Sequence, residues 1–181
     1  MKKIIAIVAL TVSGLAFADS VTLESAKVRV VDGQDQKQLK LSVKHDFTKN
    51  LTGDVSITQT QTDVTNAIGN RLEAGLTPSF QVLGLKSYTR VAVGQKTNNT
   101  TAFAYYSVEP GVSAPVGPVV VKAGFRFRSA IDTGMNADTT RTQRIGVSYP
   151  LSKSDAIGVN YDRMRGDTQQ NVTAVNYTHS F

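Results

Sequence analysis

The stretch VKAGFRFRS, residues 121–129, places phenylalanines and arginines at alternate positions. Because successive side chains of a β-strand point to opposite faces, Phe125 and Phe127 share one face of this segment, and Arg126 and Arg128 share the other. A soluble sheet would bury the phenylalanines in its core and expose the arginines to water. A transmembrane barrel turns the phenylalanines toward lipid and the arginines toward a wet interior. The segment therefore predicts a strand but leaves both arrangements open.

The first 18 residues favour an exported protein. The sequence MKKIIAIVALTVSGLAFA combines two lysines, an apolar run and a final Ala-Phe-Ala, which is typical of a secretory signal peptide and its cleavage site. We expect a signal peptide at residues 1–18 and a single domain at residues 19–181. The second of these ranges contains no apolar run of the roughly 18 to 20 residues that a spanning helix needs. Residence in a membrane would therefore require a barrel.

The composition excludes several classes of function. The 181 residues include 20 Lys and Arg, 14 Asp and Glu, two His and no Cys, with a net charge of +6. The absence of cysteine excludes thiol chemistry, disulfides and Cys-ligated metals. The basic residues alternate along the predicted strands and form no compact patch, so we expect no nucleic-acid partner. Two histidines far apart in the sequence predict no metal site, and we expect no cofactor.

Ten segments with period-two alternation account for nearly all of the exported domain. They lie near 20–31, 37–47, 52–62, 69–77, 81–94, 102–114, 118–130, 140–150, 155–165 and 171–181. The connectors alternate between short ones (TKNL, PSF, PVG, LSKS) and longer polar ones (DGQDQ, DVTNAI, KTNNTT, DTGMNADT, GDTQQ). Short periplasmic turns and longer outer loops produce this alternation in a membrane barrel. The sequence therefore predicts an all-β fold, a transmembrane antiparallel up-and-down β-barrel of about ten strands, with eight or twelve strands as alternatives.

The C-terminal segment, NVTAVNYTHSF, adds a second indication of the outer membrane. Val175, Tyr177 and His179 alternate with polar residues and lead to the terminal Phe181. This ending resembles the last strand of bacterial outer-membrane barrels, whose terminal aromatic residue is read by the insertion machinery. The resemblance implies that the barrel-insertion machinery recognises Phe181, and that the protein resides in the lipid bilayer of a Gram-negative outer membrane.

Each predicted strand has one apolar face and one polar face on which basic residues outnumber acidic ones. An arginine on the lipid face near the bilayer midplane would cost about 2 to 4 kcal/mol, so we assign the polar faces to the lumen. The predicted pore-lining residues are Arg126, Arg128, Arg90, Lys86, Lys122, Lys40, Lys44, Arg71 and Arg29, with Lys27 and Arg144 on the same faces. The acidic residues on these faces are Asp46, Asp54, Glu73, Glu109 and Asp162.

Two states of the lumen are compatible with these charges. Ten strands lie between eight-stranded barrels, which side chains can fill, and much wider water channels. The lumen could be an open pore that prefers small anionic solutes, or a plug of salt bridges in which Arg126 or Arg128 pairs with an acidic residue such as Glu73. We predict a porin that acts as a monomeric passive diffusion channel. The alternative is a plugged structural or adhesive barrel that acts through its loops, one of which contains Arg165-Gly166-Asp167.

Two further segments resemble known porins. The turn YPLSKSDA at 149–156 is similar to the periplasmic hairpin of general bacterial porins. The charged segment 37–47, together with SVEPGVS at 107–113 leading into the strand with RFR, resembles the monomeric porins specific for oligogalacturonates. Members of that family form narrow, arginine-lined channels of twelve strands that pass acidic sugars. This resemblance implies acidic oligosaccharides as solutes and lumenal positions for Lys122, Arg126 and Arg128.

We expect no enzymatic activity. His45 and His179 are the candidate general bases, and both are predicted to face outward near the periplasmic interface with no Ser or Asp on the same face. The sequence therefore places no nucleophile, base and orienting group together.

Overall fold

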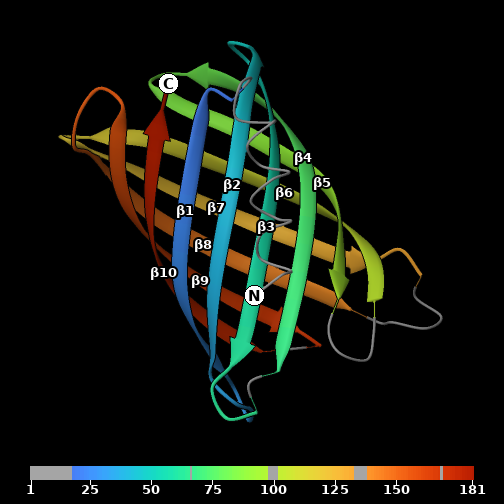
Figure 1. Ribbon diagram of the computed structural model, residues 1–181. Helices are drawn as coiled ribbons and strands as arrows, with labels where there is room; N and C mark the ends of the chain where they lie inside the picture. The colour runs from blue at the N-terminus through green and yellow to red at the C-terminus, as the bar shows by residue number, and fades with distance from the viewer. Residues whose placement is uncertain (1–17, 66, 98–101, 133–137, 168) are drawn as a thin grey trace.

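The chain forms one closed antiparallel barrel of ten strands (Figure 1). The computed structural model describes residues 18–65, 67–97, 102–132, 138–167 and 169–181, so the signal peptide predicted at 1–18 falls almost entirely outside the described residues. Strand bounds are β1 Ser20–Val30, β2 Gln36–Thr48, β3 Leu51–Thr62, β4 Ile68–Val82, β5 Leu85–Thr97, β6 Ala102–Val116, β7 Val119–Ala130, β8 Thr139–Pro150, β9 Asp155–Gly166 and β10 Gln170–Ser180. The prediction of a ten-stranded all-β barrel is confirmed.

Each strand pairs with its neighbours in the chain, and β1 closes the barrel by pairing with β10 from Ser20–Ser180 to Val30–Gln170. Both ends of the barrel domain therefore lie at one end, which we call the turn end, with the connections of two to four residues that follow β2, β4, β6 and β8. The other five connections, of three to eight residues, lie at the opposite end, the loop end. Outer-membrane barrels place their short turns in the periplasm. Among the described residues no helix is long and apolar enough to cross a membrane.

Two turns lie further along the chain than predicted. The segment Pro78–Phe80 belongs to β4, and the chain reverses at Leu83 and Gly84, whose φ angles are 52° and 80°. Two consecutive positive φ angles fit a tight hairpin turn, and glycine adopts such an angle without steric cost. Pro78 pairs with Leu51 of β3 but is skipped in the ladder to β5, so its missing N–H is tolerated inside a strand. Similarly, β6 continues past Pro115 and turns at Gly117.

The surface of the barrel is apolar and its interior is polar. Phe125 is 42% exposed, whereas its neighbour Arg126 is 8% exposed and lies inside. Exposure alternates in the same way on β5, where Val91 and Val93 are exposed and Ala92 is buried. Interior positions on several strands hold buried Ser, Thr, Glu and Arg side chains. This distribution is the reverse of a soluble protein's, and it resolves the ambiguity of segment 121–129 in favour of the membrane arrangement.

Aromatic side chains lie on the outer surface near both ends of the barrel. Those near the turn end are Phe47, Phe80, Tyr149, Tyr177 and Phe181, and those near the loop end are Tyr106, Phe125, Phe127 and Tyr161. At the turn end, His179 and Phe181 pack edge to face with ring centroids 5.0 Å apart, as do His45 and Phe47. Two such belts mark the two membrane–water interfaces of outer-membrane barrels.

Replacing Val159 by Arg should lower the stability of the barrel by about 2 to 4 kcal/mol, because a charge would enter the hydrocarbon layer near the middle of β9. Val159 is 52% exposed on the outer face. Gln143 also faces outward, but it pairs with Arg163 closer to the loop end, so the control Gln143→Arg should cost only about 0 to 1 kcal/mol. Urea titration of both variants in lipid vesicles measures the difference. Equal losses would contradict the membrane depth assigned to Val159.

Candidate functional site in the barrel lumen

Eight of the nine predicted pore-lining residues lie on the lumenal faces of their strands. Lys40 and Arg71 sit on either side of Thr58, which is 2% exposed. The other six follow from the same cross-strand register and alternation: they are Lys44, Lys86, Arg90, Lys122, Arg126 and Arg128. The structure therefore brings together basic residues from β2, β4, β5 and β7, which are far apart in the sequence.

Arg29 is the exception, and its assignment to the lumen is wrong. In β1 the buried side chains are Ala26 and Val28, so Lys27 and Arg29 between and after them point outward and are exposed. The two faces of β1 differ little in polarity, and this end of the strand lies close to the loop end. There the outer surface leaves the hydrocarbon layer, so a charged side chain no longer carries the penalty that fixed the assignment elsewhere.

Glu73 of β4 is the centre of an ion-pair cluster that crosses the lumen. Arg90 donates from Nη1 to Glu73 at 2.6 Å, and from Nε and Nη2 to Asp54 at 2.8 and 2.5 Å. Arg126, three strands away on β7, donates to the other oxygen of Glu73. The hydroxyl of Tyr105 donates to that same oxygen at 2.7 Å. Glu73 thus connects four lumenal strands.

Arg144 of β8 forms a second cluster. Its Nε and Nη2 atoms donate to Asp162 of β9 at 2.8 and 2.6 Å, and its Nη1 atom donates to Glu109 of β6 at 3.0 and 3.2 Å. One guanidinium group therefore holds two carboxylates from strands on either side, a geometry that its planar set of donors allows.

A third cluster, toward the loop end, depends on an acid that the sequence did not indicate. Arg128 donates to both oxygens of Asp138 at 2.8 and 2.9 Å, and Lys96 lies 3.6 Å from the same carboxylate. Asp138 belongs to a segment predicted as a loop, so no strand alternation signalled its direction. The guanidinium of Arg128 also lies 5.3 Å from the centroid of the Tyr105 ring, a cation–π contact.

Two lumenal tyrosines lie directly over glycines. A Cβ atom at Gly94 would come within 2.5 Å of the Tyr105 ring, and one at Gly111 within 2.3 Å of the Tyr88 ring. Backbone oxygens are also close to both positions, at 2.7 and 2.9 Å, so larger residues would disturb the wall. The glycines therefore make room for aromatic side chains inside a narrow barrel, and they position the Tyr105 hydroxyl against Glu73.

Five lumenal cations have no acidic partner within ion-pair distance among the described residues: Lys40, Lys44, Arg71, Lys86 and Lys122. Arg71 donates instead to the hydroxyl of Thr58 at 3.3 Å. Lys122 is near enough to Lys44 and to Lys86 for its charge to interact with theirs, and we call these three residues the lysine triad. The triad gives the lumen toward the turn end a local excess of positive charge.

Both histidines have acidic partners, so the prediction that none shares their face is wrong. His45 lies 3.0 Å from Asp19, and Nδ1 of His179 lies 2.9 Å from Asp155. The hydroxyl of Ser152 donates to Asp155 at 2.6 Å, which places the acid between the serine and the histidine. A nucleophile needs the base beside it, so this order does not form a hydrolytic triad.

Similarity to solved structures is confined to the fold. An outer membrane channel from Pseudomonas putida F1 matches with a TM-score of 0.59 and 8% identity, over 91% of this chain and 96% of that one. The NanC porin matches with a TM-score of 0.50 and 7% identity, over 89% and 100%. The chain spans about half the length, 49%, of an anion-selective porin from Comamonas acidovorans, matched over 80% of this chain with 18% identity and a TM-score of 0.44. That last likeness is too weak to carry an argument.

No protein-family model and no curated protein matches the sequence. The fold and the inverted distribution of polarity define the chain as a ten-stranded β-barrel of the bacterial outer-membrane type, with the lipid bilayer as its environment. Within that class, its fold is similar to those of channels and porins. Membership of the oligogalacturonate porins remains a prediction.

Replacing Glu73 by Gln should lower the free energy of unfolding by about 3 to 5 kcal/mol, because the buried Arg126 would keep its charge without an acidic partner. Lys44→Gln is the control: it removes an unpaired charge and should change stability by no more than about 0.5 kcal/mol. The loss of the folded, faster-migrating band in unheated gel electrophoresis across a urea series measures both. If both variants lose the folded band at the same urea concentration, the ion-pair cluster does not stabilise the barrel.

Proposed function

We propose that the protein is a small porin, a passive diffusion channel that prefers small anions to cations. The observation that supports this proposal is the imbalance of charge in the lumen. Asp54, Glu73, Glu109 and Asp162 are each held by an arginine. The lysine triad, Lys40 and Arg71 have no carboxylate within ion-pair distance in the described part of the chain, and one further lumenal acid, Glu24, stands opposite Lys40 in the neighbouring strand.

Selectivity in this proposal is electrostatic. A lumen lined by one sign of charge within a low-dielectric wall raises the local concentration of counter-ions and repels ions of like charge. The guanidinium groups of Arg90, Arg126 and Arg144 are neutralised by their carboxylates and contribute little to this field. Of the predicted pore-lining residues, the lysine triad therefore takes the selective role in this proposal, and Arg126 and Arg128 do not.

The ion-pair clusters set the size of the solute. Glu73 and Arg126 meet from strands separated by two others, and Arg144 meets Glu109 across one strand, β7. Such contacts narrow the passage, so small inorganic anions are the proposed solutes. Acidic oligosaccharides, which the porin resemblance implies, are the larger anions to test as blockers of the current.

The same cross-lumen contacts favour one second candidate, a plugged barrel that acts through its loops. In that case the arginines and acids would fill the interior as a structural core. The Arg165-Gly166-Asp167 loop gives the adhesive form of this candidate little support, because the backbone N–H of Thr139 donates to the carboxylate of Asp167.

We also propose that the protein is a monomer and has no enzymatic activity.

Single-channel recording of the refolded protein in a planar bilayer, with a salt gradient, tests the proposal. Steady current with an anion-selective reversal potential is the expected result. A folded, inserted barrel that passes no current would overturn the porin proposal and leave the plugged barrel.

Replacing the lysine triad by glutamine should lower the anion-to-cation permeability ratio on the order of fivefold, because local potentials of a few kT set that ratio. The control is Arg29→Gln/Arg141→Gln/Arg163→Gln, which removes the same number of charges from the outer face. Its reversal potential should equal that of the wild type. Equal shifts in both variants would show that net charge, and not the lumenal triad, sets the selectivity.

A further inference from the structure

Basic side chains also gather on the outer face of the barrel, near its loop end. The exposed, outward members of this set are Lys27, Arg29, Lys37, Arg141, Arg163 and Arg165. No Asp or Glu occupies an outward strand position at this end of the barrel within the described ranges. A lipid-facing surface is ordinarily apolar, so this concentration of charge calls for an anionic partner.

Four of these residues have no carboxylate within ion-pair distance in the described part of the chain: Arg29, Arg141, Arg163 and Arg165. The two lysines differ, because Lys27 lies 3.5 Å from Asp35 and Lys37 lies 3.2 Å from Asp63. We call the four arginines the arginine rim. All four come from β1, β8 and β9, on one side of the barrel.

The register places the arginine rim in a compact arrangement. Arg141 of β8 stands directly opposite Arg165 of β9, and like charges at such cross-strand positions repel. Arg29 and Arg163 both stand opposite Asn171 of β10, which places them two strands, about 10 Å, apart. The fold therefore holds together four positive charges that repel one another in the absence of an anion.

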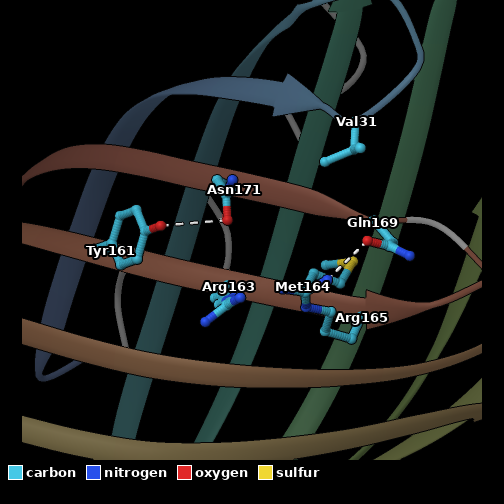
Figure 2. A pocket seen from close by; sticks show the side chains of 7 residues that line it. All are labelled: Val31, Tyr161, Arg163, Met164, Arg165, Gln169 and Asn171. Carbon is cyan, nitrogen blue, oxygen red and sulfur yellow. Dashed lines mark hydrogen bonds between the residues drawn. The ribbon is translucent and has the colours of Figure 1, made fainter.

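A shallow pocket of about 280 Å³ adjoins the arginine rim and is lined by two of its members, Arg163 and Arg165. Figure 2 shows Tyr161, Arg163, Arg165, Gln169 and Asn171 around it. The Tyr161 hydroxyl donates to Oδ1 of Asn171 at 3.3 Å, and Nη1 of Arg165 donates to Oε1 of Gln169 at 2.8 Å. The Asn171 amide N–H groups and the Arg163 guanidinium are left as donors. The lining thus combines positive charge with hydrogen-bond donors.

We propose that the arginine rim binds the phosphate groups of membrane lipid headgroups in the leaflet on the loop side. Guanidinium groups bind phosphate through paired, charge-assisted hydrogen bonds. Tyr161 marks the interface at this level, and exposed Ile145, Val159 and Val175 continue the outer surface toward the turn end. A headgroup on the rim would therefore place its acyl chains along this apolar surface, a contact that a free phosphate ion cannot make.

Native mass spectrometry of the intact protein in detergent, titrated with phosphatidic acid, tests the proposal. The wild type should retain phosphatidic acid. In a parallel titration it should release phosphatidylcholine, whose phosphate charge is balanced by its own ammonium group. Arg29→Gln/Arg163→Gln should weaken retention roughly 10- to 30-fold, because each basic side chain near an anionic lipid surface contributes about a factor of five. Lys49→Gln/Lys153→Gln is the control, since it removes two charges from the turns at the opposite end, and it should retain the lipid as the wild type does.

A second variant keeps the test decisive if the first does not fold. Arg141→Gln/Arg165→Gln removes a repelling pair, so it should fold at least as stably as the wild type and still lose retention. Equal retention by the wild type and the rim variants would overturn the proposal. If millimolar inorganic phosphate displaces the lipid and binds with the same affinity as the lipid, the site binds free phosphate, and the proposal of a lipid ligand is wrong.

Discussion

The structure depends on the hydrogen-bonded seam between β1 and β10. Inside a bilayer an open sheet edge would leave its N–H and C=O groups without partners, at several kcal/mol for each group. The seam runs the full length of both strands, from Ser20–Ser180 to Val30–Gln170, and the N–H of Phe181 donates to the carbonyl of Asp19 beyond it. Closure at ten strands then fixes how much interior the side chains must share, and the lumenal chemistry follows from that space.

Within so small an interior, arginine and lysine take different roles. Arg90 and Arg144 each satisfy two carboxylates from different strands, with paired hydrogen bonds to one carboxylate that the planar guanidinium permits and that an ammonium group, a point charge, does not match. The arginines thereby form ion pairs with the lumenal carboxylates near them. Four lumenal lysines, Lys40, Lys44, Lys86 and Lys122, and one arginine, Arg71, have no carboxylate within ion-pair distance among the described residues, while Lys96 shares Asp138 with Arg128. The donor geometry of arginine therefore accounts for most of the division of the lumen into an ion-paired network and a positively charged region.

The alternation in segments such as 121–129 was enough to predict the strands, their number and most of their faces, because period two is a local property of the backbone. The contact between Arg126 and Glu73 was beyond prediction as a specific pair, since it depends on closure and on register accumulated over three strand pairs. Pro78 suggested a turn, but β4 continues through it, and the residue is only left unpaired in the hydrogen-bond ladder to β5. Arg29 was placed inside because the rule that keeps charge off the outer face holds only within the hydrocarbon layer.

The outward side chains of β9 show where the hydrocarbon layer ends. Its outward side chains run from Ile157 and Val159 through Tyr161 to Arg163 and Arg165, so the surface changes from apolar to aromatic to basic within one strand. At about 3.3 Å per residue, Val159 and Arg163 are about 13 Å apart along the strand, and the tilt of a membrane strand reduces that to about 10 Å of depth. Tyr161 therefore lies close to the edge of the hydrocarbon layer. The positive charge of the chain is divided by this boundary into a lumenal set, which we propose acts on solutes, and an outer set, which we propose binds headgroups.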